Sequence, residues 1–401
     1  MTNATSHSDG LLAGYRIVDL SSMLAGPFCG YQLALMGAEV IKVEAPEDGD
    51  LARLFGADAD LGQQRMGASF LAQNAGKSSI VLNLKDKNDR AILSDLVATA
   101  DVVLENYRPG VMTRLGFGYD VLQTLRPGIV YCAITGFGAT GPLSQRPAYD
   151  QIIQGFWGVM DITGTPESGP LRAGFPICDI LGGLHGAYAI AAALARREQT
   201  GEGARLDVSL MESTMSALAW AASNYLIAGK DPSRFGNDNT AASPSGTFRT
   251  ADGMINIAAN KQQQYEALCH AIKRDDPISD ARFALRRDRL TNRAELKAEI
   301  EHTLATRGTA EWDTIFAAAS VPAGPVLSVP QALSHPHIAA RDFVQQFDDM
   351  PVPSGRPLSI LRGGFQVDGK SPKVDRPPPH LDAQRDEILA DLARRQKRVA
   401  E

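Results

Sequence analysis

YRIVDLSSMLAGPFCGYQLALMGAEVIKVE, residues 15–44, decides the fold of this chain. Its apolar clusters predict a strand at residues 15–20, a helix at 28–37 that closes on Gly37, and a second strand at 38–44. A strand, a helix and a strand in this order form a βαβ unit with two parallel strands.

The same alternation continues towards the C-terminus. Strand and helix patterns follow one another at residues 78–84, 89–100, 101–106, 119–127, 129–137, 180–201 and 205–213. Strands that alternate with helices predict an α/β fold, in which a mostly parallel, Rossmann-like sheet is covered on both faces.

The amino-acid composition changes at residues 228–245, which are rich in Gly, Pro, Ser, Asn and Asp. This composition predicts a linker or mobile loop. Beyond it, residues 246–260 predict a hairpin with Ala-Asp-Gly at its turn, and residues 262–306 predict helices. The motif RPPPH at residues 376–380 predicts an extended segment before a last charged helix at 382–396. A smaller α+β domain is therefore expected after the large one.

Size and charge narrow the functional classes. A chain of 401 residues exceeds what one hydrophobic core usually spans, so two domains are expected. The formal net charge of -6 does not indicate a nucleic-acid-binding protein, which usually carries an excess of positive charge.

The first ten residues, predicted to be a disordered lead-in, lack the apolar core of a secretory signal. The longest apolar run, residues 187–195, is shorter than the roughly 20 residues that cross a bilayer, so no membrane partner is expected.

Several common sites are disfavoured. The turn after residues 15–20 lacks the Gly-x-Gly-x-x-Gly of dinucleotide enzymes, and GKSS at residues 76–79 does not complete a phosphate loop. The four cysteines are far apart and show no zinc or disulfide pattern, and no other cluster has metal spacing, so no metal is expected. Cys178 lacks the flanking glycines of a nucleophile elbow, and Cys178 and His185 are expected to be packed side chains.

The segment GFPICDILGGLHG, residues 174–186, places Asp179 at the start of a glycine-rich and alanine-rich helix. One interpretation is a nucleophilic carboxylate, with small residues that let the helix pack closely or let a ligand approach. The other is an ordinary aspartate N-cap, which is common and does no chemistry.

A second candidate is ENYRPG, residues 105–110, which follows a predicted parallel strand. Ligands of open α/β sheets bind at this edge, so Arg108 and Arg114 are candidates for phosphates, and Asn106 with Tyr107 for adenine or pantetheine. The alternative is a solvated arginine beside a Pro-Gly turn.

These motifs together resemble the class III CoA-transferase family, which includes formyl-CoA transferase, carnitine-CoA transferase and α-methylacyl-CoA racemase. The resemblance covers nearly the whole chain and rests on RIVDLSSMLAGPFCG, GAEVIKVE, NAGKSSIVLNLK, ENYRPGVMTRLGFGYD, ITGFGATGP, RPAYDQIIQ, the Asp179 region and TGEGARLDVSLMES.

The resemblance implies that Asp179 is the catalytic aspartate, which attacks a thioester carbonyl and passes through an aspartyl anhydride and an aspartyl-CoA thioester. The site must then exclude water, and residues 228–245 are one candidate for a lid. Coenzyme A enters as a thioester substrate, and no tightly bound cofactor is implied. Carried over position by position, the CoA contacts fall on Ala25, Leu82, Lys85, Asn106, Tyr107, Arg114, Thr135 and Gly136, and Tyr149 is added to this set. Because some relatives carry basic residues where this chain has Ala45 and Thr135, Arg108 or Lys77 is expected to supply a further phosphate contact.

One position separates two chemistries of the family. The racemase branch carries a histidine where this chain has Tyr149, and tyrosine, with a reference pKa of about 10, is a poor base at neutral pH. Transfer of CoA from an acyl-CoA donor such as succinyl-CoA to a small (di)carboxylate is therefore predicted. The alternatives are an acyl-CoA racemase or epimerase and a non-catalytic CoA-binding subunit. Absence of the glycine-run loop of the formyl-CoA enzyme disfavours formyl and oxalyl substrates.

The family also implies an interlocked homodimer, which fits a cytoplasmic enzyme. The expected organisation is a lead-in at residues 1–10, a large CoA-binding domain at 11–227, a small domain with its linker at 228–330, and a C-terminal segment at 331–401 that completes the large domain. A dicarboxylate needs a second cation, for which the candidates are Arg53, Arg65, Arg146 and Arg172.

Overall fold

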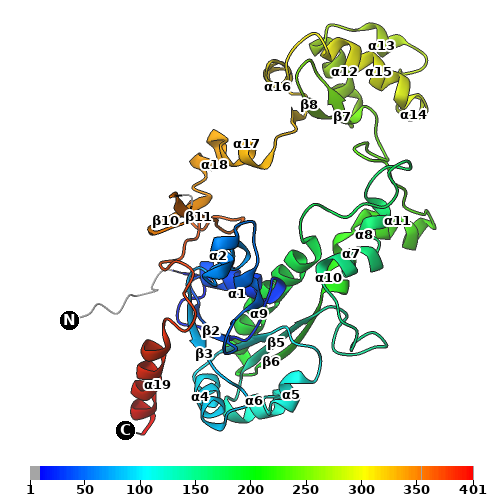
Figure 1. Cartoon of the computed structure of the whole chain (residues 1–401). Helices are drawn as coiled ribbons and strands as arrows, with labels where there is room; N and C mark the ends of the chain where they lie inside the picture. Colours follow the sequence, from blue (N-terminus) through cyan, green and yellow to red (C-terminus); the bar gives the residue numbers. More distant parts are fainter. Residues whose placement is uncertain (1–9, 354, 401) are drawn as a thin grey trace. The chain divides into compact units, whose positions relative to one another are not determined.

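The computed structural model describes residues 10–353 and 355–400, and its centre is a six-stranded sheet (Figure 1). All neighbouring strands in this sheet run parallel, in the order β3-β2-β1-β4-β5-β6. The predicted α/β class with a parallel sheet is confirmed. The strands are β1 (Arg16–Asp19), β2 (Glu39–Glu44), β3 (Lys77–Val81), β4 (Val102–Glu105), β5 (Val130–Thr135) and β6 (Ala204–Ser209).

Helices cover both faces of the sheet because its strands are apolar on both sides. Ile17 and Val102 face a core shared with α1 (Ala25–Leu35) and α9 (Ile177–Thr200). The next residues along the same strands, Val18 and Val103, face a core shared with α4 (Lys87–Ala98), α5 (Val111–Arg114) and α6 (Tyr119–Leu125). Figure 1 shows the two helical layers on opposite sides of the sheet.

The strand order reverses between β1 and β4, so the connections that follow these strands leave in opposite directions. Such a switch point, at the carboxyl ends of the strands, is where open α/β sheets bind ligands. Both α1, which follows β1, and α9, which precedes β6, begin at this carboxyl edge.

Two helices begin earlier than predicted. Helix α1 starts at Ala25 rather than at residue 28, because Pro27 fits in the first turn of a helix, where its missing N–H is not needed. Helix α9 starts at Ile177 and has Pro176 at its N-cap, so Asp179 lies inside the first turn. The N-cap interpretation of Asp179 is therefore wrong.

Helix α9 also corrects the expectation from the apolar run at residues 187–195. It has 24 residues and is long and apolar enough to cross a bilayer by length and composition. A core helix passes the same test, and 44% of its apolar window is buried in the protein. Its contacts with α1, α10 (Leu210–Ala217) and the sheet are those of a core helix.

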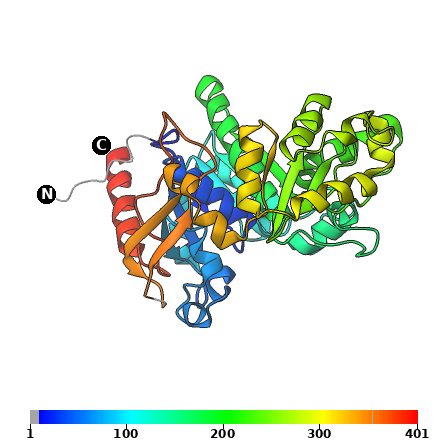
Figure 2. The ribbon, with the colours of Figure 1, turned by 90° about the horizontal axis from the view of Figure 1, so that it is seen from above.

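The C-terminal segment returns to the edge strand β3 (Figure 2). The backbone N–H of Gly76 donates to the carbonyl oxygen of Arg376, and those of Ser79 and Val81 donate to the side chains of Gln384 and Asp382. These bonds protect an edge that would otherwise be open to pairing. Asp382 has a φ of 63°, which is outside the helical range, and the last helix, α19 (Arg385–Ala400), begins three residues later than predicted.

The chain divides into two compact units. The large one consists of residues 1–160, 172–232 and 336–401, and the small one of residues 161–171 and 233–335. The lead-in predicted at residues 1–10 lies outside the described residues, apart from Gly10. The other elements of the large unit are η1 (Leu51–Leu54), α2 (Ala59–Gln63), α3 (Ala68–Leu71), α7 (Asp150–Phe156), α11 (Trp220–Ala228), α18 (Pro336–Ala340), β10 (Val344–Pro351) and β11 (Pro357–Leu361). Helix α8 (Val159–Ile162) lies at the boundary.

The small unit has its own core, which contains Tyr265, Trp312 and Phe316. The predicted hairpin is confirmed as an antiparallel pair, and a third strand that was not predicted pairs with its second strand. Its elements are β7 (Ser245–Arg249), β8 (Met254–Ala258), α12 (Gln262–Ala271), α13 (Asp276–Ser279), α14 (Arg286–Thr291), α15 (Arg293–Leu304), α16 (Thr309–Ala318), β9 (Ala323–Pro325) and α17 (Val329–Leu333).

Candidate active site

Asp179 lies in the first turn of α9, at the carboxyl edge of the sheet. Burial of its carboxyl group raises its pKa, and the nearby negative charge of Asp150 raises it further, to about 7. A carboxylate with such a pKa is more basic, and hence a better nucleophile, than an ordinary aspartate. It is still about half ionised at neutral pH.

Asp150 is a site residue that the sequence interpretation missed. It opens α7, and its Oδ1 accepts hydrogen bonds from the backbone N–H of Cys178, at 2.8 Å, and of Asp179, at 3.3 Å. These are N–H groups of the first turn of α9, which have no partner within their own helix. Asp150 thus caps α9 from another helix. The only sequence signal was its place in the RPAYDQIIQ motif, directly after Tyr149.

Three glycines of α9 permit close packing of the helix. A Cβ atom on Gly183 would lie 2.7 Å from the carbonyl oxygen of Ala25, and one on Gly182 would lie 2.3 Å from Leu210. A Cβ on Gly186 would lie 2.8 Å from Ile134. Of the two predicted roles, the structure assigns these glycines to helix packing. Their packing also brings Ala25, at the start of α1, close to the turn of α9 that follows Asp179.

The loop between β1 and α1 is held in place by side chains from two other segments. Asn106 accepts a hydrogen bond from the N–H of Ser22, at 2.9 Å, and donates one to its carbonyl oxygen, at 2.7 Å. Asp50 accepts hydrogen bonds from the Ser22 hydroxyl and from the N–H of Met23, whose φ is 71°. Both polar atoms of the Asn106 amide are therefore engaged, and this residue shapes the loop at the switch point.

Buried ion pairs lie beneath this loop. Lys77 Nζ is 2.9 Å from Asp19 Oδ2, and Lys42 Nζ is 2.8 Å from Asp50 Oδ2. Burial alone would raise the pKa of Asp19, but the charges of Lys77 and Lys42 outweigh it and hold that pKa below its usual value. These pairs fix the carboxyl ends of β1 and β2, from which the loops of the site emerge.

The four arginines that were candidates for binding a second substrate carboxylate differ in their burial and in their partners. Arg53 is wholly buried and pairs with Glu44 through two hydrogen bonds of 2.7 Å, so it serves the core and cannot bind substrate. Arg65 is paired with Asp48, and Arg146 lies over the ring of Phe156. Arg172 is exposed and has no ion pair within the described part of the chain.

The ENYRPG segment follows β4, as predicted. Buried Glu105 accepts hydrogen bonds from the Tyr131 hydroxyl and from the N–H of Tyr107, both at 2.6 Å, and burial raises its pKa to about 7. Tyr107 is half-buried. Arg108 and Arg114 are exposed, and neither forms an ion pair with any described residue, so both guanidinium groups are available to an anion.

The other expected contacts occupy the same edge of the sheet but differ in exposure. Thr135 is the last residue of β5, and Gly136 follows it. A Cβ atom on Gly136 would lie 2.4 Å from the Cβ of Ala148. This turn therefore packs against the residue before Tyr149. Tyr149 is 63% exposed. After β3, Lys85 is exposed, whereas Leu82 is buried in the core and offers a ligand only its backbone.

Cys178 and His185 are packed side chains, as predicted. Cys178 is fully buried, and its burial raises the pKa of its thiol to about 11, so it is not a thiolate nucleophile. His185 is half-buried, and its Nδ1 donates to the carbonyl oxygen of Leu181 at 2.8 Å.

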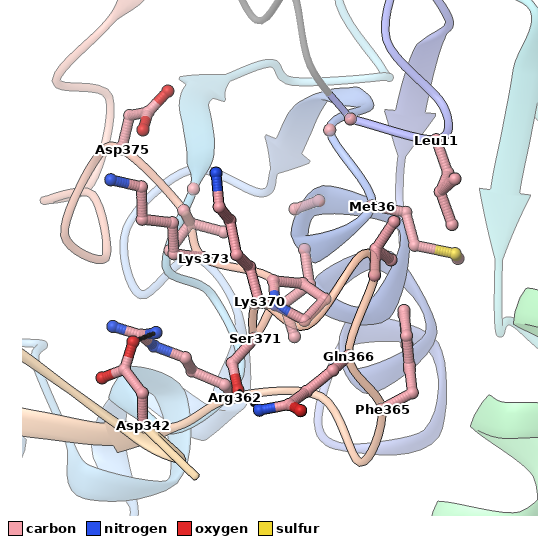
Figure 3. Close-up of a pocket in the computed structure, with 18 of the residues that line it drawn as sticks. Leu11, Met36, Asp342, Arg362, Phe365, Gln366, Lys370, Ser371, Lys373 and Asp375 are labelled. Atoms are coloured by element: carbon pink, nitrogen blue, oxygen red, sulfur yellow. Dashed lines mark hydrogen bonds and ion pairs between the residues drawn. The ribbon is translucent and has the colours of Figure 1, made fainter. Parts of the chain in front are cut away.

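A cavity of about 820 Å³ lies at the opposite edge of the sheet, beside the end of α1 and the start of β3. Figure 3 shows Lys370, Lys373 and Asp375 on one side of it and Leu11 and Phe365 on another. None of the predicted site residues lines this cavity. The candidate active site is therefore the carboxyl edge around Asp179.

Comparison with known proteins extends over almost the whole chain. Residues 12–385 match the model of a family described as CoA-transferase family III. The chain is 40% identical to acetyl-CoA:oxalate CoA-transferase of Acetobacter aceti, over 88% of each protein, and 36% identical to succinate–glutarate CoA-transferase of Agrobacterium fabrum, over 95% of each. The crystal structure of a CAIB/BAIF family protein from Brucella suis is similar with a TM-score of 0.84 and 36% identity, over 95% of this chain and 99% of that one.

Proposed function

The chain belongs to CoA-transferase family III, and from that premise we propose that it moves CoA from succinyl-CoA to a small dicarboxylate, with Asp179 as the nucleophile. The observation that carries the proposal is the partly buried Asp179 carboxyl, whose pKa of about 7 combines basicity with partial ionisation at neutral pH. It lies at the edge of the sheet to which Ala25, Tyr107, Arg108 and Arg114 also belong.

The reaction proceeds in four displacements. Asp179 attacks the thioester carbonyl and expels CoA thiolate, which leaves a mixed anhydride on the enzyme. The thiolate attacks the Asp179 carbonyl of this anhydride, releases the donor carboxylate and forms an aspartyl-CoA thioester. The acceptor carboxylate attacks this thioester to form a second anhydride, and the thiolate then attacks the acceptor carbonyl and restores Asp179. No net proton is gained or lost, so no separate acid or base is required.

Binding of CoA would use Arg108 and Arg114, which form no ion pair with any described residue. Arg108 and Arg114 supply charge for the phosphates, since guanidinium groups bind phosphate oxygens in a bidentate manner. The remaining contacts would come from Ala25, Leu82, Lys85, Tyr107, Thr135, Gly136 and Tyr149, with Asn106 acting on the Ser22 loop.

We include a homodimer in the proposal because of α11. In this helix Trp220, Leu226 and Ile227 are 75%, 80% and 85% exposed, and none of its residues is buried. Large apolar side chains exposed together on one helix mark an interaction surface, and a second copy of the chain would cover it. A cytoplasmic location is supported by four buried cysteines that form no disulfide.

The donor and acceptor are chosen by analogy with the relatives. The Agrobacterium protein is named for succinate and glutarate, and the Acetobacter protein for acetyl-CoA and oxalate. We propose glutarate as the first acceptor to test. Oxalate belongs in the same panel, although the missing glycine-run loop disfavours it, because the relative at 40% identity is named for it.

The test is to trap the intermediate. The protein is incubated with succinyl-CoA and hydroxylamine, and its peptides are mapped by mass spectrometry, in parallel with Asp179→Asn and with Asp120→Asn, an exposed aspartate, as the matched control. A hydroxamate on Asp179 in the wild type and the control, but not in Asp179→Asn, supports the proposal. Deuterium exchange at the α-carbon of a 2-methylacyl-CoA, without hydroxamate, would overturn it in favour of racemisation.

A further inference from the structure

Gln154 is wholly buried although its side chain is polar, and every polar group of that side chain has a partner. Its Nε2 donates to Asp150 Oδ2, at 2.6 Å, and to the carbonyl oxygen of Phe175, at 3.3 Å. Its Oε1 accepts from the N–H of Ala173, at 2.8 Å. The amide therefore joins α7 to the segment that leads into α9.

These partners belong to the two segments that meet at the first turn of α9. Asp150 holds the N–H groups of Cys178 and Asp179 with its other oxygen. Ala173 and Phe175 lie a few residues before Asp179 in the same segment. The Gln154 side chain thus holds both the Asp150 carboxylate, which caps the first turn of α9, and the backbone segment that leads into this helix.

The orientation of the Gln154 amide follows from its neighbours. The N–H of Ala173 requires an acceptor, and the carboxylate of Asp150 and the carbonyl of Phe175 require donors. Only the amide oxygen can face Ala173, and only the amide nitrogen can face Asp150. A neutral side chain that offers both a donor and an acceptor is therefore required at this position.

We propose that Gln154 is a positioning residue for Asp179, acting through Asp150. Its amide keeps the Asp150 carboxylate against the first turn of α9, so that Asp179 is held ready for attack on the thioester and experiences a single neighbouring negative charge. The titratable groups that interact electrostatically with the Asp179 carboxyl, among the described residues, are Asp150 from α7 and the thiol of Cys178 on α9 itself.

This inference rests on the proposed function and makes two separable predictions. Gln154→Leu removes all three hydrogen bonds, and misplacement of a reacting group by about 1 Å can cost about 100-fold in rate. We expect kcat and the rate of hydroxamate formation on Asp179 to fall by about 10- to 100-fold, while KM for succinyl-CoA changes by less than about threefold, because the proposed CoA contacts lie elsewhere.

Gln154→Glu keeps an acceptor for Ala173 but places a second carboxylate beside Asp150. The added negative charge disfavours ionisation of Asp179, so the acid limb of kcat/KM moves to higher pH, by about one unit. The matched control is Gln151→Glu, the same change on the same helix at an exposed position, which should keep the wild-type profile and rate.

Thermal unfolding of each variant separates lost folding from lost positioning, and Gln154→Glu supplies the decisive profile if Gln154→Leu does not fold. A folded Gln154→Leu with wild-type kcat, or an acid limb in Gln154→Glu that coincides with that of Gln151→Glu, would overturn the inference. Failure of the wild type itself to form a hydroxamate would instead overturn the proposed function.

Discussion

Asp150 Oδ1 accepts a hydrogen bond from the backbone N–H of Asp179, at 3.3 Å, and the charge of Asp150 also raises the pKa of the Asp179 side chain. One carboxylate therefore orients the helix turn that carries Asp179, the proposed nucleophile, and makes the Asp179 carboxyl more basic. The two aspartates come from helices that are separated in the chain by a third, and the fold brings them together.

The first prediction concerns pH. As the proposed nucleophile, Asp179 must be ionised to attack, and its pKa is about 7. We therefore expect kcat/KM to increase with pH through 7, with a decrease of about tenfold for each pH unit below that value. Asp150→Asn removes the neighbouring charge but keeps an oxygen acceptor for the N–H groups. The acid limb should therefore move to lower pH, by about one unit. Steady-state rates from pH 5 to 9 would show this, and a limb that moves to higher pH would contradict it.

The second prediction concerns stability. A raised carboxyl pKa means that the folded state binds more protons than the unfolded state between pH 3.8 and about 7, so the free energy of unfolding falls as pH rises through this range. Asp179→Asn removes the ionisable group and therefore abolishes this decrease in the free energy of unfolding. It should stabilise the protein increasingly from pH 5 to pH 8, by at most about 4 kcal/mol for a shift of this size. Urea unfolding at the two pH values measures the gain, and an equal gain at both would refute the explanation.

The strands and the order of elements could be predicted from the sequence because apolar clusters and turn residues are local signals. The pattern of residues 15–44 was sufficient to predict β1, α1 and β2. Asp179 was also singled out from its segment, and its proposed role came from the resemblance to the family.

The support around Asp179 could not be predicted in the same way. The cap that Asp150 supplies to α9 depends on tertiary packing, so a local rule assigned the cap to Asp179 itself. Arg53 illustrates the same limit: its charge suggested a carboxylate site, whereas its pairing with Glu44 and its burial depend on how distant segments fold together.

A third prediction tests the packing of α1 on α9. Gly183→Ala would place a Cβ 2.7 Å from the carbonyl oxygen of Ala25, a rigid backbone atom. We expect a loss of about 1–3 kcal/mol in the free energy of unfolding, despite the better helix propensity of alanine. Gly364→Ala, where a Cβ meets nothing within 4 Å, is the matched control and should be nearly neutral. Equal denaturation midpoints for the two variants would show that α1 and α9 can separate without cost.

A fourth prediction concerns the buried pair of Lys77 and Asp19. Lys77→Met leaves the Asp19 carboxylate buried without its ion-pair partner, which should cost about 3–5 kcal/mol. Lys87→Met, at an exposed position on α4, is the control and should change stability by less than about 0.5 kcal/mol. Adding Asp19→Asn to Lys77→Met should restore part of the loss. If it does not, the pair is not the cause.

A fifth prediction locates the CoA phosphates. Arg108→Ala and Arg114→Ala should each raise KM for succinyl-CoA by about tenfold, the effect of one lost charge-assisted hydrogen bond, and leave kcat nearly unchanged. Lys370→Ala is the control, since it removes a cation from the cavity at the opposite edge of the sheet. A raised KM in Lys370→Ala, with unchanged values in the two arginine variants, would place CoA in that cavity instead.

The packing of α19 against β3 joins two segments that are far apart in the chain. Ile388 and Leu392 of α19 belong to the same core as Ile80 of β3 and Ile41 of β2. A nascent chain presents Ile80 roughly 300 residues before α19 emerges, which at ribosomal speed is tens of seconds. During that interval, the edge strand β3 and the apolar residues beside it lack their cover from α19. A chain truncated before Ile388 would therefore retain Asp179 but leave the core around Ile80 without its cover from α19, so residues far along the chain complete the core of the first strands.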